Sequence, residues 1–208
     1  MFFVIDGIDG TGKTTQCRML SDWLTSQGYK VQLCRDPGGT TLGDQLRSIL
    51  LSPTTDICLR AETLLFMCSR AQLIHEVVQP ALARDEIVIC DRFISSNFAY
   101  QGFANGLTYQ AIADLGRFSI DECMPTQTFI LDIPIELSHQ RRKTTLDRIE
   151  QRDDAYFQKV REGYLQLTID DNNRYCLVDA QGSVEDVQQQ LQKMIQPYLN
   201  RFTLKNAP

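Results

Sequence analysis

Apolar residues along the chain follow two alternating patterns. Short apolar runs, typical of buried strands, occupy residues 2–6, 30–35, 86–91, 128–133 and 175–179. Longer stretches have apolar residues at helical spacing, over residues 13–27, 42–51, 60–84, 108–120, 135–143, 154–170 and from 183 onward. Gly28 is placed to end the first helix, and Pro80 to bend or interrupt the long third one.

This alternation predicts the fold class. Parallel strands need crossover connections, and these are right-handed, so helices that separate the strands come to cover both faces of the sheet. We therefore predict an α/β fold of three layers, in which a five-stranded parallel sheet is flanked by helices. Residues 1–208 are expected to form a single domain.

Composition and charge narrow the function classes. The chain has 208 residues, of which 43% are hydrophobic and 23% charged, and its net charge is -5. These values fit one globular core and exclude a disordered tail, a collagen repeat or a coiled-coil rod. The negative charge argues against a nucleic-acid partner, although a few cations converging in a cleft could still bind a small anion.

Neither a membrane segment nor a disulfide framework is indicated. No apolar run approaches the ~20 residues of a membrane-spanning helix, and the first residues carry no basic leader. The seven cysteines contain no CxxC pair, so we interpret them as reduced thiols rather than a disulfide framework or a zinc site. We expect a cytoplasmic protein without a membrane partner.

The loop after the first strand matches the pattern G-x-x-x-x-G-K-[ST]. Its residues are Gly7, Ile8, Asp9, Gly10, Thr11, Gly12, Lys13 and Thr14. Such a loop points backbone N–H groups inward, and the next helix adds the positive end of its dipole. Lys13 is expected to reach the β- and γ-phosphates, and the Thr14 hydroxyl to bind Mg²⁺. A plain tight turn with a solvated lysine is the alternative, but the strand before and the helix after favour a phosphate-binding loop.

This loop makes the predicted domain a P-loop NTPase fold. It indicates a nucleoside triphosphate without specifying the reaction. The Asn-Lys-x-Asp segment of guanine-selective proteins is missing from the sequence, and motor or helicase ATPases usually have longer chains. A small kinase is therefore the leading interpretation.

Further motifs follow in a fixed order along the chain. They are Arg-Asp-Pro-Gly-Gly-Thr at 35–40, Ala-Glu-Thr-Leu-Leu-Phe-Met-Cys-Ser-Arg at 61–70, Asp-Arg-Phe at 91–93, Ser-Asn-Phe-Ala-Tyr-Gln-Gly at 96–102 and Leu-Asp-Arg-Ile-Glu at 146–150. With the P-loop, they closely resemble the bacterial thymidylate kinases over residues 2 to about 167. The resemblance implies transfer of the ATP γ-phosphate to deoxythymidine monophosphate (dTMP), giving dTDP and ADP for dTTP synthesis, with Mg²⁺.

The resemblance also implies an acceptor site. Arg35 and Arg92 would hold the acceptor phosphate, and Arg92 would act with Lys13 in catalysis. Further residues that the family places around base and sugar are Asp9, Ser96, Tyr100 and Gln101, with Arg47 at the border.

Phe66 and Arg70 lie one helical turn apart and so emerge on one face of their helix. An aromatic ring there can stack on a base while the arginine donates to thymine O4, a position at which the cytosine amino group would be disfavoured. For Phe66 alone, core packing would be the simpler explanation; the paired Arg70 favours stacking.

A basic lid is expected near residues 137–150, containing Gln140-Arg141-Arg142-Lys143. Arg141 is our first candidate, and Arg148 the second, for the cation that stabilises the transferring phosphoryl group. A solvated basic turn is the alternative. Asp91 ends an apolar strand, as a carboxylate that meets Mg²⁺ through water would, although it could instead pair with Arg92 or cap a helix.

Two departures from the family and two rival functions complete the prediction. The family commonly has Glu where this chain has Asp36, and the basic lid segment here, Gln140-Arg141-Arg142-Lys143, lacks the regularly spaced arginines of the family. The eukaryotic branch has arginine where this chain has Gly10; in the bacterial branch the lid supplies that cation, so Gly10 and a basic lid belong together. The family is usually homodimeric through long helices, and the helix after Arg60 is the candidate interface, although burial within one subunit explains its apolar residues equally well. The rivals are a kinase for another nucleotide or nucleoside, and a nucleotide-binding switch without an acceptor.

Overall fold

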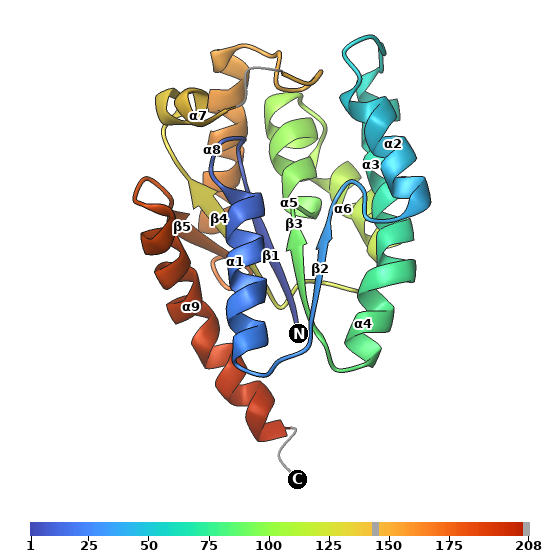
Figure 1. Ribbon diagram of the computed structural model, residues 1–208. Coiled ribbons are helices and arrows are strands. Elements are labelled where there is room, and N and C mark those ends of the chain that lie inside the picture. Colours follow the sequence, from blue (N-terminus) through green and yellow to red (C-terminus); the bar gives the residue numbers. More distant parts are fainter. Residues whose placement is uncertain (143–145, 206–208) are drawn as a thin grey trace.

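The computed structural model describes residues 1–142 and 146–205, with side chains up to Arg201. Its five strands are β1 (Phe2–Gly7), β2 (Val31–Arg35), β3 (Ile87–Asp91), β4 (Gln127–Asp132) and β5 (Tyr175–Asp179). They form one parallel sheet in the order β2-β3-β1-β4-β5 (Figure 1). The predicted parallel sheet is confirmed, and each strand ends within one residue of its predicted limits.

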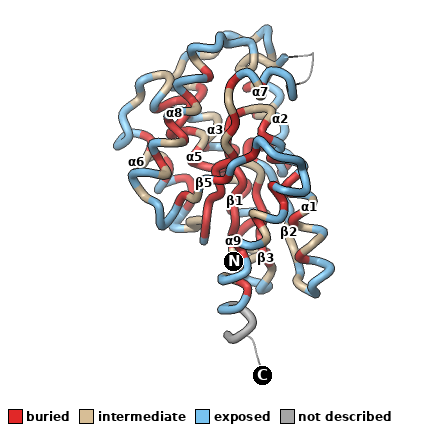
Figure 2. Tube along the Cα trace, turned by 90° about the vertical axis from the view of Figure 1, so that its left-hand side faces the viewer, coloured by how far each residue is buried: buried red, intermediate tan, exposed pale blue. Residues whose placement is uncertain are grey.

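The centre of the sheet is the core of the molecule. Val4 of β1 lies in register with Cys90 of β3 on one side and with Thr128 of β4 on the other, and all three are buried. A strand covered on both faces reads as a continuous apolar run, which is why these segments were recognisable in the sequence. Figure 2 shows the buried strands enclosed by helices whose outer sides are exposed.

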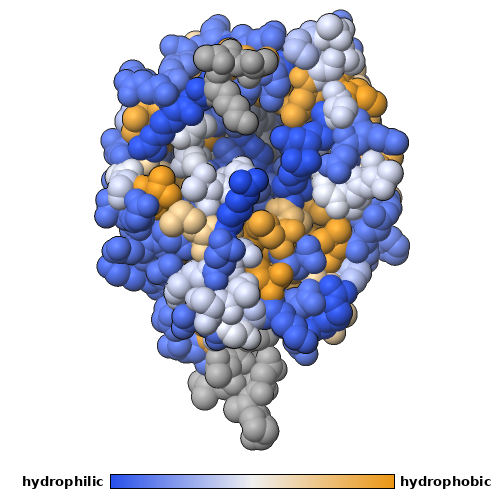
Figure 3. Space-filling model, viewed as in Figure 1, coloured by the Kyte–Doolittle hydropathy of each residue, from blue (hydrophilic) through white to orange (hydrophobic). Residues whose placement is uncertain are grey.

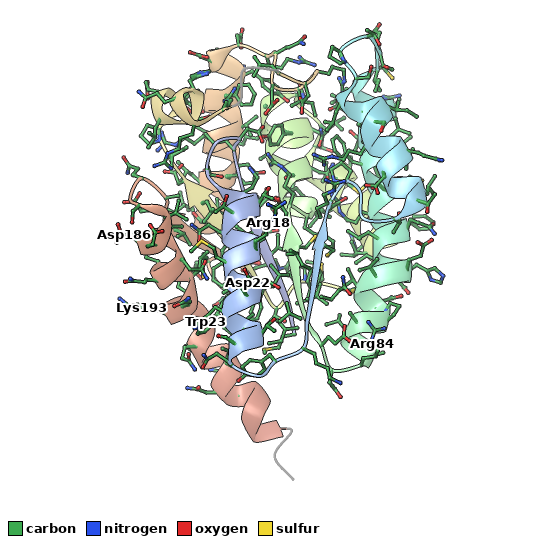
Figure 4. The ribbon with its side chains drawn as sticks, viewed as in Figure 1. Arg18, Asp22, Trp23, Arg84, Asp186 and Lys193 are labelled. Atoms are coloured by element: carbon green, nitrogen blue, oxygen red, sulfur yellow. The ribbon has the colours of Figure 1, made fainter. Side chains whose placement is uncertain are left out.

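Helices cover both faces of the sheet, as predicted. α1 (Lys13–Ser26) and α9 (Val184–Lys205) pack side by side on one face, where the partly buried Trp23 of α1 contacts the core (Figures 1 and 4). The other helices are α2 (Thr41–Leu51), α3 (Leu59–Leu73), α4 (Gln79–Ala83), α5 (Ile94–Asn97), α6 (Tyr109–Ile120), α7 (Ile135–Arg141) and α8 (Asp154–Asp170). None of the helices within residues 1–142 and 146–205 is long and apolar enough to cross a membrane.

The long helix predicted over residues 60–84 is interrupted ahead of Pro80. Between α3 and α4 lies a π-helical turn, η1 (Ile74–Val78). Pro80 has no N–H group with which to close a normal helical turn. The turn before it therefore widens, so that the carbonyl groups of that turn find other donors. The irregularity therefore lies one turn earlier than the proline that causes it.

A helical segment that the sequence did not predict follows β3. α5 continues into a second π-helical stretch, η2 (Phe98–Ala104), which packs against α8. Serines and asparagine are poor helix formers in this stretch, which is why its helical character was missed. Gly163 of α8 permits the close approach, since a Cβ there would lie 2.8 Å from Cβ of Phe103. This packing fixes the wall of the acceptor pocket described below.

The lid segment is described in two parts. α7 ends at Arg141, two residues before the predicted end of that helix, and Arg142 follows in an extended conformation. Lys143, which the sequence placed in the basic lid, lies outside the described residues, and the chain is described again from Leu146.

Candidate active site

The loop between β1 and α1 lies at the carboxyl edge of the sheet, where ligands of open α/β sheets bind (Figure 1). Gly12 directly precedes α1 with φ 90°, and Gly10 has φ 82°, a region that favours glycine. A Cβ at Gly10 would lie only 2.6 Å from the carbonyl oxygen of Ser138 in α7. The P-loop therefore touches the lid helix directly, and only glycine fits between them.

Lys13 is buried at the start of α1 and faces the loop. Its Nζ donates to the carbonyl oxygen of Ile8 at 2.8 Å and lies 3.6 Å from Oδ1 of Asp9. Burial, together with the positive charge of Arg92, lowers the pKa of Lys13 even though carboxylates nearby oppose the change. Lys13 and Arg92 thus place two cations close together beside the loop, an arrangement that suits a polyanion.

Thr14 and Asp91 meet beside the loop. Oγ1 of Thr14, in the first turn of α1, donates to Oδ2 of Asp91, the last residue of β3, at 2.5 Å. A hydroxyl and a single carboxylate are the hard oxygen ligands that Mg²⁺ takes alongside substrate phosphates and water. These two residues therefore fit the predicted metal role. No cluster of three or more metal-ligating side chains is found in the described part of the chain.

Arg92 has a left-handed backbone, with φ 69°, and its guanidinium points back toward the P-loop. It donates to Asp9 Oδ1 and, at 2.9 Å, to the carbonyl oxygen of Gly7. Burial lowers the pKa of Arg92, but Asp9 and its other neighbours raise it well above the usual value. Burial likewise raises the pKa of Asp9, and the charges of Arg92 and Lys13 outweigh that effect and hold it below its usual value.

Asp6, which sequence reasoning did not select, organises this region. Its buried carboxylate accepts from Ser95 Oγ at 2.6 Å, Tyr164 OH at 2.7 Å and Ser96 Oγ at 2.9 Å. Burial and the Asp6 charge raise the pKa of Tyr164 well above its usual value, so this hydroxyl remains a donor. A carboxylate ending a fully apolar strand was the signal that could have identified Asp6.

An acceptor pocket opens beside Arg92. It collects all but one of the predicted substrate residues, namely Asp9, Arg47, Phe66, Arg70, Arg92, Ser96, Tyr100 and Gln101. Arg35 lines the larger cleft over the P-loop instead, where it is half exposed and pairs with Asp44 at 3.1 Å. Asn97 also lines the pocket, and sequence reasoning missed it because nothing in its local pattern distinguishes it from an ordinary polar residue.

Arg70 is held at the floor of the acceptor pocket by Asp36. Nε and Nη2 both lie 2.6 Å from Oδ2 of Asp36, and the Arg70 guanidinium lies over the ring of Phe93. Burial raises the pKa of Asp36, although the charge of Arg70 opposes this. Phe66 and Arg70 both line the pocket, as the one-turn spacing predicted. The shorter side chain at position 36 still reaches the arginine.

The lid arginines go to three different places. Arg141 donates to the backbone oxygens of Ala180 and Gln181, after β5, at 2.8 and 3.0 Å. Arg142 lies over the ring of Phe157, and its charge contributes to the lowered pKa of Asp9 in the P-loop. Both line the large cleft.

Arg148 is held elsewhere. It donates to Glu62 Oε2 at 2.6 Å and to the carbonyl oxygen of Leu50 at 2.8 Å. It is not among the described residues that line either pocket.

The two pockets meet at shared residues. Asp9, Asp36, Arg47 and Arg92 line both the large cleft and the acceptor pocket. Arg35, Arg47 and Arg92 all line the large cleft, and burial together with the charges of the other two arginines lowers the pKa of Arg47. In the space-filling view, hydrophilic residues border a hollow above the start of α1 (Figure 3). A P-loop beside a second pocket that is lined by arginines is the arrangement of a P-loop kinase that phosphorylates a small molecule.

Comparison with known proteins identifies the family. A sequence model of the thymidylate kinase family matches residues 5–191. Thymidylate kinase of Exiguobacterium sibiricum is 40% identical over 203 residues, which cover 96% of each chain, and that of Pseudomonas syringae pv. tomato is 41% identical over 198 residues, 94% of each. The crystal structure of thymidylate kinase from Ehrlichia chaffeensis superposes with a TM-score of 0.78 at 30% identity, covering 94% of this chain and 98% of that one. The chain belongs to the thymidylate kinase family, which confirms the resemblance seen in its motifs.

The contact between Gly10 and Ser138 gives a first test. Gly10→Ala should weaken binding of a non-hydrolysable ATP analogue by at least about tenfold, because the added methyl group forces the P-loop away from α7. Gly28→Ala is the matched control: Gly28 also has a positive φ, 87°, but a Cβ there meets nothing within 4 Å. Isothermal titration calorimetry should show normal affinity for the control. Equal affinities in the two variants would contradict the role of the contact.

Proposed function

We propose that this protein transfers the γ-phosphate of ATP to dTMP, producing dTDP and ADP for dTTP synthesis. The observation that carries this proposal is the meeting of the two pockets at Arg47 and Arg92, with the P-loop on one side and the pocket lined by Phe66 and Arg70 on the other. A nucleotide switch has no need of the second pocket. The names of the family relatives support the same reaction.

Phosphoryl transfer between two nucleotides requires positive charge in the site more than it requires a general base. A phosphate monoester, with a second pKa near ~6, is already a nucleophile at neutral pH. Two unit negative charges about 4 Å apart repel by about 4 kcal/mol at an effective dielectric of 20, so two polyanions cannot approach unaided. Lys13 and Arg92 supply fixed charge on either side of the transfer, and Asp9 holds both in place. Arg47 is positioned to meet the acceptor phosphate where the pockets join.

Thymine recognition follows from donors and acceptors in the acceptor pocket. Arg70, aligned by Asp36, offers N–H donors that suit the thymine O4 carbonyl. Oδ1 of Asn97 has no hydrogen-bond partner within the described residues, so it can accept from the N3–H group of the base. Cytosine has a donor in place of the O4 acceptor and an acceptor in place of the N3–H donor. Each of these mismatches would leave buried polar atoms unpaired. Phe66 supplies the ring on which the base stacks.

Mg²⁺ would be held by Thr14 and, through water, by Asp91. When bound, the ion neutralises charge on the β- and γ-phosphates. Thr14 and Asp91 hold each other in the required place through their hydrogen bond.

Use of ATP and the presence of free thiols at all seven cysteines suit a reducing, cytoplasmic location. We assign residues 137–150 to a lid on the single domain.

The substrate claim is tested with a panel of monophosphates. A coupled assay with ATP and Mg²⁺ should give the highest kcat/KM with dTMP, compared with the monophosphates of deoxyuridine, deoxycytidine, uridine and adenosine. Lys13→Met should lose about a thousandfold or more in kcat with its fold intact, which excludes a contaminating kinase. Faster turnover of any other monophosphate would overturn the assignment, and turnover of none would favour a nucleotide switch.

The lid provides the next test. Among the described lid cations, we assign stabilisation of the transferring phosphoryl group to Arg142 rather than to Arg141 or Arg148, because Arg142 donates to Oγ of Ser138, which in turn donates to the backbone oxygen of Asp9 in the P-loop. Arg142→Met should lower kcat by about a thousandfold with little change in the KM of dTMP. Arg141→Met, which removes contacts to the loop after β5, should mainly raise the KM of ATP. Steady-state kinetics in which Arg141→Met shows the greater loss of kcat would reverse the assignment.

A homodimer is proposed through α3 and α6. These helices pack together, and each leaves a large apolar side chain in solvent: Leu64 is 54% exposed and Phe118 90% exposed. α3 also buries Met67 and Leu73 within its own subunit, so both explanations of its apolar residues apply. A second copy of the chain is the occupant that would cover the exposed part.

Light scattering after size-exclusion chromatography should give the mass of a dimer for the wild type and of a monomer for Phe118→Asp, since burying a charge opposes association. Ile169→Asp, at an exposed residue of α8, is the control and should remain dimeric. A monomeric wild type at micromolar concentration would rule out the proposal.

A further inference from the structure

Three buried polar side chains and the partly buried Arg148 form a line from the lid to the acceptor pocket. Arg148 Nη2 donates to Glu62 Oε2 at 2.6 Å, and Gln101 Nε2 donates to the other oxygen, Oε1, of Glu62 at 2.8 Å. Asn97 Nδ2 then donates to Gln101 Oε1 at 2.9 Å. Asn97, Gln101 and Glu62 are each at most 4% exposed. Only Asn97 and Gln101 line the pocket, so the other end of the line lies behind its wall.

The direction of each hydrogen bond in this line is set by charge. An amide presents an oxygen and a nitrogen of similar size, so shape alone does not decide which way it turns. A guanidinium can only donate and a carboxylate can only accept. Because Glu62 offers only acceptors, Gln101 must turn its nitrogen toward Glu62 and its oxygen toward Asn97. Asn97 must then turn its nitrogen toward Gln101, which leaves its oxygen as the free group.

We propose that Glu62, anchored by Arg148, sets the base specificity of the acceptor pocket from outside it. This inference rests on the proposed function, in which Oδ1 of Asn97 accepts from the N3–H group of thymine. Two hydrogen bonds, from Gln101 to Glu62 and from Asn97 to Gln101, transmit the polarity of the Glu62 carboxylate to Asn97, which contacts the base. Arg148 is accordingly a positioning residue, and Arg70 reads the neighbouring C4 position independently.

Glu62→Gln tests the inference because it keeps the shape of the side chain while replacing one acceptor by a donor, at the loss of the negative charge that pairs with Arg148. Arg148 requires an oxygen facing it, so the new amide turns its nitrogen toward Gln101. Gln101 and Asn97 then both turn over, and Asn97 presents a donor to the pocket. The ratio of kcat/KM for dTMP to that for 5-methyl-dCMP should fall about tenfold to a hundredfold, mainly through the KM of the acceptor. The KM of ATP should stay the same.

Removing the anchor should restore the preference in part. In Glu62→Gln/Arg148→Met, nothing holds the new amide in the reversed direction, so the ratio should return toward the wild-type value. Glu162→Gln is the matched control, because Glu162 is an exposed carboxylate that also accepts from a glutamine, Gln158, at 3.0 Å. Its ratio should equal that of the wild type.

A second variant covers the case in which Glu62→Gln does not fold, as judged by circular dichroism. Gln101→Met cuts the line but keeps the pair of Glu62 and Arg148, and its ratio should also fall. Two results would overturn the inference and assign Glu62 a purely structural role. One is an equal loss of kcat/KM for dTMP and 5-methyl-dCMP in the folded variants, and the other is no recovery of the ratio in the double variant. A wild type that fails to phosphorylate dTMP would overturn the proposed function itself. A wild type that phosphorylates dTMP, together with variants whose ratios equal that of the wild type, would overturn only the inference.

Discussion

The buried carboxylate of Asp6 is the interaction on which the geometry of the site depends. It gathers hydroxyl groups from α5 and α8 at the end of the central strand, next to the first residue of the P-loop. Tyr164 and Ser96, which Asp6 holds in place, also contact Arg92. The same carboxylate therefore helps to position both the P-loop and the acceptor pocket. An unpaired carboxylate at this depth would be strongly destabilising, and its several donors make the arrangement stable.

Around that point, four cations are each paired with a carboxylate. Lys13 and Arg92 share Asp9, Arg70 has Asp36, and Arg148 has Glu62. Pairing limits the freedom of long side chains, so little reorganisation is needed when the substrates bind. In the proposed function, pairing also separates roles: the pairs close to the P-loop would meet phosphate, and the pairs farther away would orient groups that contact the nucleobase. The same residue types would then serve catalysis and selection at different depths.

The fold and the main site were largely predictable from the sequence, for physical reasons. Strands buried on both faces appear as apolar runs, and the P-loop pattern specifies its own geometry. Asn97, Glu62 and Asp6 were missed because their importance comes from partners far away in the chain, such as the 158 residues that separate Asp6 from Tyr164. The positions of Arg142 and Arg148 likewise depend on Phe157 and Glu62, which no local spacing indicates.

The tight fit of Gly10 against Ser138 has an evolutionary consequence. A single substitution cannot bring an arginine into this P-loop, because the carbonyl group of α7 already occupies the space where any side chain would begin. A lineage that moved its positive charge from the lid to the P-loop would first have to shift α7. During that shift the enzyme would still depend on the cation in the lid. The two arrangements are therefore separated by a barrier of coordinated changes, and descendants of one would rarely cross to the other.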